Sequence, residues 1–279
     1  MSSKKQNNTS IYTFIVIIVI VLVLMGLMIF FVLGGKNSPT SPSSSLSNKS
    51  FDSKPVSQSI MSKLSSVSLS AISGSLTTAP KSNISHINNT LLTKNSLPRV
   101  VYIGADYCPF CAAERWALII ALSKFGTFSN LHYMTSSSSD VYPNTATFTF
   151  YNATYKSSYV TFTPVETTTN IPSASGSYTP LQNMTQLEAK LFSKYDAPPY
   201  VTQSSSGSIP FVDMANKYLL VGAQYVPAVL QNKNWSQIIS SVYLYNSKIS
   251  NNILSSAGYL IKDICSITNE KPQNVCSQI

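Results

Sequence analysis

The longest apolar run of the chain lies near its start, and its pattern predicts a membrane span. From Ile11 to Leu33, 23 residues carry no charge, and a single Tyr, Thr and Gly interrupt the aliphatic and phenylalanine side chains. A helix rises about 1.5 Å per residue, so this run can cross a hydrocarbon core of roughly 30 Å. It is about twice as long as the apolar region of a cleaved signal peptide. We therefore expect a signal anchor at residues 11–33 that follows a short cytoplasmic tail at residues 1–10.

The segment after the apolar run has the composition of a tether. Of residues 37–80, 20 are Ser or Thr, and two prolines lie near the start. Such a composition cannot bury a core and is typical of a surface stalk, here assigned to residues 34–54. This places the C-terminal bulk of the chain outside the membrane. Apolar residues from Val56 to Ile72 then recur near helical spacing, so a helix is expected to begin the folded domain close to residue 55.

Residues 55–279 are long enough for one well-cored domain, and their apolar patterns predict both helices and strands. The expected elements are a strand at Arg99–Gly104, an apolar helix that stops at Gly126 with Lys124 in its last turn, strands at Ala146–Tyr151 and Tyr159–Val165, a helix at Thr185–Tyr195, and a helical region at Trp235–Ile264.

Charge changes this picture by excluding one class of partner. The formal net charge is +9, but residues 1–98 hold eight Lys against one acidic residue, so the excess belongs mainly to the anchor and stalk. Nucleic-acid binding requires Lys or Arg clustered on one face, whereas these lysines are scattered and Arg occurs twice. No nucleic-acid partner is expected.

Two cysteines lie where the predicted strand turns into the predicted helix. Cys108 and Cys111 are separated by Pro109 and Phe110, and Pro109 fits the first helical turn, where no N–H bond is lost. The free N–H groups and partial positive charge of a helix N-terminus stabilise a thiolate and lower the pKa of the first cysteine. Cys108 is therefore the expected nucleophile, and Cys111, three residues later on the same helix face, can resolve a mixed disulfide.

The stretch from Val100 to Gly126 resembles the active-site strand and helix of the thioredoxin superfamily. Tyr107 stands where an aromatic residue commonly precedes the first Cys, and Pro109-Phe110 is similar to the dipeptide of glutaredoxins. Far downstream, GSIPFVDMANKYLLVG at residues 207–222 resembles the conserved-proline hairpin of that superfamily. The resemblance implies a thioredoxin-like α/β fold, with a central mixed sheet flanked by helices. Relative to a minimal thioredoxin, residues 55–97 would be an N-terminal extension and residues from about 137 to 205 an insertion.

In that hairpin, Pro210 is expected to follow a cis peptide bond and to face the dithiol. An X-Pro bond that opens an apolar strand is a known place for a cis peptide. The alternative is an ordinary trans proline that begins a strand. Ile209 is then expected to offer its backbone edge to a substrate chain.

A closer resemblance is to a family of archaeal membrane-anchored proteins known as domain of unknown function 929. It is carried by YIGADYCPFCAAERWALIIALSKFGTF, by SSSSDVYPNT and by the closing ICSITNEKPQNVC, and it covers roughly residues 55–279. The family has no agreed activity. Membership therefore implies the fold and adds little to the mechanism beyond the dithiol.

Cys265 and Cys276 flank a Lys-Pro turn after the long helical region. They most simply form a structural disulfide that holds the tail on the helix, and a second redox pair that relays electrons is the alternative. A zinc site built from four cysteines fits poorly, because zinc usually takes two tight Cys pairs.

Two acidic residues flank the dithiol. Asp106 and Glu114 are candidates to accept a proton as Cys111 becomes nucleophilic, if buried beside it. The alternatives are a turn or cap residue for Asp106 and an acid favoured near a helix start for Glu114. His86 and His132 are interpreted as surface or core residues, and the alternative is a copper site built from the dithiol and a histidine.

Together these observations predict a single-pass membrane protein with an extracytoplasmic domain. Its expected activity is thiol–disulfide exchange on the thiols or disulfides of exported proteins, with no cofactor and no metal. The alternative is a surface-display or scaffold protein that keeps the fold and has only structural disulfides.

Overall fold

A computed structural model describes residues 52–79 and 81–279 of the 279-residue chain. The expected cytoplasmic tail, the apolar run at residues 11–33 and nearly all of the expected stalk lie outside the described residues. Among the helices of the described part, none is both long and apolar enough to cross a membrane. The last two residues that sequence analysis placed in the stalk already contact the domain. Ser53 N–H donates to the carbonyl of Tyr133, and Tyr133 N–H donates to the carbonyl of Lys54, each at 2.9 Å.

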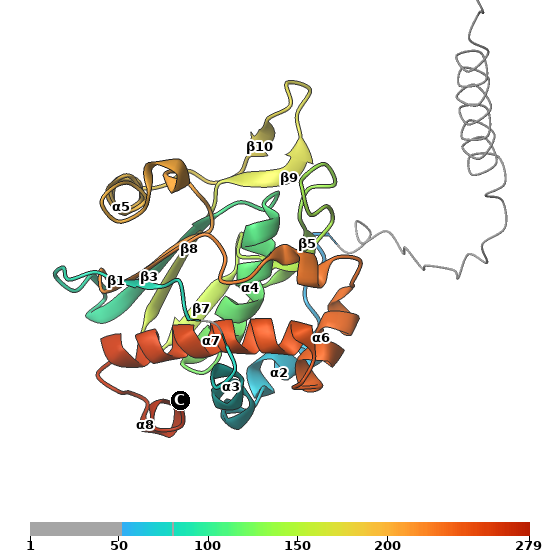
Figure 1. The fold of residues 1–279 in the computed structure, drawn as a ribbon. Helices are drawn as coiled ribbons and strands as arrows, with labels where there is room; N and C mark the ends of the chain where they lie inside the picture. Colours follow the sequence, from blue (N-terminus) through green and yellow to red (C-terminus); the bar gives the residue numbers. More distant parts are fainter. Residues whose placement is uncertain (1–51, 80) are drawn as a thin grey trace, which may run out of the picture. The chain divides into compact units, whose positions relative to one another are not determined.

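The fold is a central mixed sheet with helices on both faces, together with three small two-stranded sheets (Figure 1). The helices are α2 (Gln58–Ser66), α3 (Leu69–Leu76), α4 (Pro109–Leu122), α5 (Gln186–Tyr195), α6 (Trp235–Tyr243), α7 (Lys248–Ile267) and α8 (Gln273–Cys276). The strands are β1 (Ser85–His86), β2 (Thr93–Lys94), β3 (Leu97–Gly104), β4 (Gly126–Ser129), β5 (His132–Thr135), β6 (Ala146–Thr149), β7 (Thr154–Ser157), β8 (Thr161–Glu166), β9 (Thr168–Pro172), β10 (Tyr178–Pro180), β11 (Phe211–Met214) and β12 (Tyr218–Val221). Two short 3₁₀ turns lie at Gln203–Ser205 and Pro227–Leu230.

Strand β3 organises the sheet. It pairs with β8 in parallel over Arg99–Gly104, and with β11 in antiparallel over Val100–Ile103. Strand β11 pairs in turn with β12, which completes the hairpin predicted at residues 207–222. The range 137–205, expected as an insertion, therefore supplies β8 to the central sheet and α5 to one of its faces.

Both faces of β3 are buried, which explains its unbroken run of apolar residues. Val100 and Tyr102 point into the larger core with α4 and α7, whereas Val101 and Ile103 point into a second core covered by α5. Figure 1 shows α5 and α7 on opposite sides of the sheet. Because β3 pairs with a strand on each side and is buried on both faces, the position of the loop that follows Gly104 is fixed at its start.

The structure divides two predicted helical stretches. The first becomes α2 and α3, because the side chains of Ser57 and Ser68 each cap a new helix by accepting an N–H bond three residues later. The region predicted at Trp235–Ile264 likewise becomes α6 and α7. Ser247 caps α7 by accepting from the N–H of Ser250 at 3.0 Å.

The dithiol helix ends earlier than predicted. Helix α4 stops at Leu122, so Lys124 lies beyond its last turn and Gly126 opens β4. Lys124 Nζ instead donates to two backbone carbonyls at the C-terminal end of α2, those of Ser65 and Val67, at 2.7 and 2.5 Å. Gly126 is needed there because a Cβ atom would collide with the carbonyl oxygen of Lys156 on the paired strand β7.

Candidate active site

The dithiol lies at the junction of β3 and α4, as the sequence predicted. Cys108 is the N-cap residue of α4, and its Sγ accepts a hydrogen bond from the backbone N–H of Cys111 at 3.2 Å. Pro109 occupies the first turn of the helix. Both cysteines are free thiols; the Cys108 residue is 5% exposed and Cys111 is fully buried. Only Cys108 can meet a partner without a rearrangement of the site.

The two thiols differ in acidity. Burial raises the pKa of Cys108, but hydrogen bonds from the Cys111 side chain and from the backbone N–H groups of Cys111 and Phe110, together with the charge of Arg115, lower its pKa further than burial raises it. The pKa of Cys111 is raised well above its usual value by burial first and by its interaction with Cys108 second. Cys108 is therefore the more acidic thiol of the pair, and Cys111 keeps its proton to a higher pH.

The segment before β11 reaches the dithiol from the other end of the chain. The Ile209–Pro210 peptide bond is cis, as predicted, and the Cys108 thiol lies 3.7 Å from the carbonyl oxygen of Ile209. The Ile209 side chain packs against the small apolar cluster formed by Ala105, Cys108 and Cys111. The structure thus brings the two predicted motifs together.

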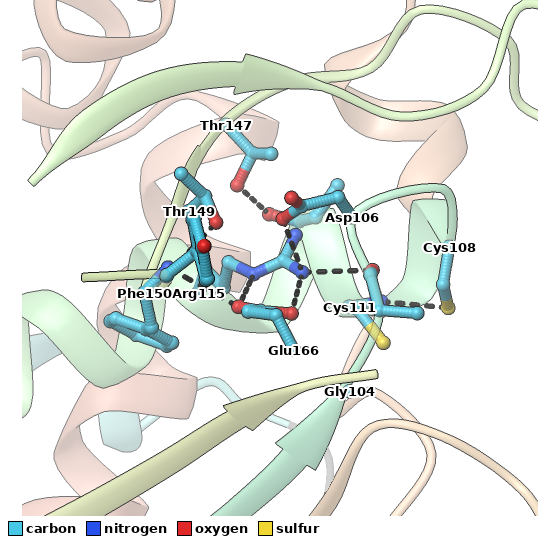
Figure 2. Close-up of polar contacts among 12 residues, drawn as sticks. Gly104, Asp106, Cys108, Cys111, Arg115, Thr147, Thr149, Phe150 and Glu166 are labelled. Atoms are coloured by element: carbon cyan, nitrogen blue, oxygen red, sulfur yellow. Dashed lines mark hydrogen bonds and ion pairs between the residues drawn. The ribbon is translucent and has the colours of Figure 1, made fainter. Parts of the chain in front are cut away.

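A buried guanidinium lies one helical turn after Cys111. Arg115 donates to both carboxylate oxygens of Glu166, from Nε at 2.9 Å and from Nη2 at 2.6 Å (Figure 2). Its Nη2 also donates to the carbonyl of Ala105 at 2.8 Å and lies 3.5 Å from Asp106 Oδ1. Arg115 therefore ties α4 to the end of β8 and to the loop that carries the dithiol, and its charge lowers the pKa of both cysteines.

Asp106 belongs to this charged cluster. Its carboxyl group is buried, and burial followed by the nearby charge of Glu166 raises its pKa to about 7, against the opposing charge of Arg115. Oδ1 has no hydrogen-bond partner in the described part of the chain beyond the long contact with Arg115. Asp106 also lines a pocket of about 280 Å³ whose walls include His132, Thr149 and Asn170.

Glu114 faces a different part of the molecule. Its fully buried carboxylate accepts from the backbone N–H of Gln224 at 3.0 Å and from Gln224 Nε2 at 3.1 Å. Burial raises its pKa to about 7, although the bonds from Gln224 oppose this. Within the described residues, no hydrogen bond joins Glu114 to either cysteine. Of the two acids predicted as candidates, Asp106 is the one that contacts Arg115.

Aromatic side chains surround the dithiol loop. The ring of Tyr107 stacks on Tyr178 of β10, with centroids 4.1 Å apart and an interplanar angle of 4°. Phe110 is 37% exposed and meets the ring of Tyr142 edge to face, with centroids 5.8 Å apart. Both partners come from segments inserted around β8.

Sequence reasoning missed Arg115, Glu166, Tyr142 and Tyr178. A signal existed for Arg115, because it is one of two arginines in the chain and stands four residues after Cys111 within an apolar helix. Glu166 could not be found in this way. Its role depends on the parallel pairing of β8 with β3, which local periodicity does not report.

The remaining predicted residues lie outside this cluster. Cys265 and Cys276 form the predicted disulfide, which joins α7 to α8. Glu270 lies near them, and among the described residues these three are the only group of metal-binding residue types with closely spaced ligand atoms. The two sulfur atoms, however, are bonded to each other. His86 packs on Tyr218, and His132 Nδ1 lies 3.0 Å from the carbonyl of Asn130.

Comparison with known proteins adds one finding. No curated protein and no solved structure matches the chain. The family model described as Domain of unknown function (DUF929) matches residues 83–266, a range that includes the dithiol, Arg115, Glu166 and the cis-proline. Since this match covers more than half of the chain, the protein belongs to the DUF929 family.

Proposed function

We propose that the protein is a thiol–disulfide oxidoreductase that acts on exported proteins. One observation carries this proposal: the Cys108 sulfur lies at the N-terminus of α4, accepts the N–H of Cys111 at 3.2 Å, and lies beside the Ile209 carbonyl that precedes a cis-proline. This arrangement lowers the pKa of one thiol and leaves a backbone edge beside it. A purely structural cysteine pair requires neither feature.

The topology supports a thioredoxin-like interpretation of the domain. The dithiol strand β3 pairs in parallel with β8 and in antiparallel with β11, and α4 follows the dithiol on one face while α5 covers the other. The resemblance to the thioredoxin superfamily implies that the strand before the dithiol helix pairs, in one mixed sheet, with the hairpin that carries the cis-proline. The hairpins β5–β6 and β9–β10 and the pair β4–β7 are additions around this unit.

The proposed reaction has two exchange steps. The thiolate of Cys108 attacks one sulfur of a substrate disulfide, the substrate S–S bond breaks, and one substrate thiolate leaves. Cys111 then loses its proton and attacks the Cys108 sulfur, which releases the second substrate thiolate and forms the Cys108–Cys111 disulfide. The substrate gains two electrons and the dithiol loses two. The reverse sequence oxidises a substrate dithiol.

We assign the proton acceptor for Cys111 to Asp106 rather than Glu114. Asp106 shares Arg115 with the dithiol loop, and its pKa of about 7 suits proton uptake near neutral pH. The carboxylate of Glu114 is bonded to Gln224. Arg115 would balance the negative charge that moves among the two thiols and Asp106 during the reaction.

The reduction potential of the Cys108–Cys111 pair tests the activity. The full-length protein is equilibrated with glutathione redox buffers, and free thiols are trapped and located by mass spectrometry. We expect exchange at a potential above about −270 mV while Cys265–Cys276 stays oxidised. If both pairs resist reduction below about −300 mV, the dithiol is structural and the scaffold alternative replaces the enzyme. A Cys108→Ser variant provides the baseline.

We further propose that residues 11–33 anchor the protein in a membrane with the domain on the outer side. The length and apolar character of this run support the proposal. Extraction of membranes with alkaline carbonate should leave the full-length protein in the pellet and release a chain that lacks residues 1–33. A full-length chain that is released by carbonate would contradict the anchor.

A further inference from the structure

The segment SSSSDVYPNT, residues 136–145, forms a closed and internally bonded loop between β5 and β6. Ser136 N–H donates to the carbonyl of Thr145 at 3.0 Å, and Thr145 N–H donates back to Ser136 Oγ at 2.9 Å. The hydroxyl groups of Ser136 and Thr145 also donate to the carbonyl of Tyr142, at 3.0 and 2.9 Å. Four hydrogen bonds thus hold the loop in one conformation.

This loop is attached directly to the dithiol segment. The N–H of Ser137 donates to the carbonyl of Tyr107 at 2.9 Å, one residue before Cys108. On the same loop, the ring of Tyr142 packs against Phe110, which lies between the two cysteines. The position of the loop relative to Cys108 is therefore determined by one backbone bond and one ring contact.

The loop presents apolar surface beside the thiolate. Val141 is 67% exposed and precedes Tyr142, and Phe110 is 37% exposed. Val141 precedes Tyr142, whose ring contacts Phe110, so these apolar groups lie together, and contiguous exposed apolar groups mark interaction surfaces. Because the loop is already ordered, a partner that binds it loses little additional conformational entropy there.

The one charged residue of the loop at residues 136–145 is acidic. Asp140 precedes Val141, accepts its N–H at 2.6 Å, and is among the main charges that raise the pKa of the Tyr107 phenol. The guanidinium of Arg115 is fully buried beneath the dithiol and paired with Glu166. An acidic partner would meet repulsion here, whereas an apolar or basic one would not.

From these contacts we propose that residues 136–145 and Phe110 bind a large apolar or aromatic side chain of a polypeptide substrate, adjacent to its reacting cysteine, and disfavour acidic neighbours. This inference rests on the proposed oxidoreductase function and names its substrate class. The Cys108 thiolate attacks the substrate sulfur while the neighbouring side chain packs on Val141, Tyr142 and Phe110.

A trapping experiment with the full-length Cys111→Ser protein tests this specificity. Three synthetic peptides differ only in the residue before their single cysteine, which is Phe, Ala or Glu, and each cysteine is activated as a mixed disulfide with 2-thiopyridine. Attack by Cys108 on the peptide sulfur forms the trapped mixed disulfide and releases pyridine-2-thione, whose absorbance gives the rate. We expect the Phe peptide to react about tenfold faster than the Glu peptide.

Variants then locate the preference. Added to Cys111→Ser, Val141→Ser should reduce the Phe-to-Glu ratio to about threefold or less, and Asp140→Asn should raise the rate of the Glu peptide selectively. Leu244→Ser is the matched control, because Leu244 is 68% exposed and lies between α6 and α7; it should keep the tenfold ratio. Each ratio is measured within one variant, so general changes in thiol reactivity cancel.

The outcomes separate the two proposals. If 2,2′-dipyridyl disulfide, a small neutral reagent, fails to react with Cys108 at neutral pH, the oxidoreductase function fails and this inference fails with it. If that reagent reacts but the three peptides react equally, the oxidoreductase function stands and the specificity is overturned. A preference that persists in both Val141→Ser and Asp140→Asn also overturns the role of the loop.

Discussion

Arg115 and Glu166 form a two-point ion pair one helical turn after Cys111, and neither side chain is exposed to solvent. The pair joins α4 to the C-terminal end of β8. Nη2 of Arg115 also donates a hydrogen bond to the Ala105 carbonyl of the dithiol loop. A buried pair of this kind is costly to break from one side, because the remaining charge loses its partner without regaining water.

Removing one partner should therefore destabilise the domain strongly. We expect Arg115→Met to lower the free energy of unfolding by about 3–5 kcal/mol, measured by urea denaturation at pH 7. The double variant Arg115→Met/Glu166→Gln should recover part of this loss, since the Glu166 charge is no longer left without its partner. Lys233→Met, which removes an exposed cation, should change stability by less than about 0.5 kcal/mol. A double variant no more stable than the single one would contradict this account.

Much of the site's framework could be predicted from local sequence. The apolar run before Cys108 indicated β3, and the position of Pro109 indicated a helix start. Each of these depends on a few neighbouring residues. The hairpin and the cis bond at Pro210 were predicted from the resemblance of residues 207–222 to the conserved-proline hairpin of the thioredoxin superfamily. The disulfide between Cys265 and Cys276 was likewise the simplest pairing of two nearby cysteines, and the structure confirms it.

What could not be predicted depends on pairing between distant segments. The parallel register of β8 and β3 brings Glu166 to Arg115, and nothing in the local pattern of either strand specifies it. Helix ends were also missed where a serine competed with the continuing pattern. Ser68 and Ser247 start new helices within stretches whose apolar spacing suggested one.

The acidity of Cys108 gives a second prediction. In the reduced protein, iodoacetamide should modify Cys108 with an apparent pKa below the 9.0 of an ordinary thiol, and Cys111 should react only at higher pH. Arg115→Met should shift the Cys108 profile to higher pH, because Arg115 is one of the groups that lower its pKa. Mass spectrometry of alkylated peptides between pH 5 and 10 measures both profiles. Equal reactivity of the two cysteines would contradict the assigned roles.

A third prediction concerns the buried carboxyl of Glu114. Its pKa in the folded state is about 7, above the 4.5 of the free group, so the folded protein holds this proton more tightly than the unfolded chain. Its contribution to stability is complete below pH 4.5 and is lost as the pH rises through 7. From pH 5 to pH 8 the free energy of unfolding should fall by about 2.5 kcal/mol more in the wild type than in Glu114→Gln.

Urea denaturation of both proteins at the two pH values measures this difference. Other buried carboxyl groups, such as Asp106, titrate in both proteins and cancel in the comparison. Glu270→Gln, which replaces an exposed carboxyl, is the matched control and should follow the wild type. Parallel pH profiles for wild type and Glu114→Gln would show that Glu114 does not hold its proton in the folded state.

The disulfide between Cys265 and Cys276 should stabilise the domain without taking part in the exchange reaction. It closes a loop with a sequence separation of 11 between α7 and α8. Closing a loop of this length removes entropy from the unfolded chain worth about 3 kcal/mol, so the double variant Cys265→Ser/Cys276→Ser should lose about that much free energy of unfolding. The rate of Cys108 alkylation at pH 7 should stay the same, because the pair is not among the main groups that set the pKa of Cys108. If the variant instead keeps its stability but can no longer be reoxidised at Cys108–Cys111 by glutathione disulfide, the second pair relays electrons and its structural assignment is wrong.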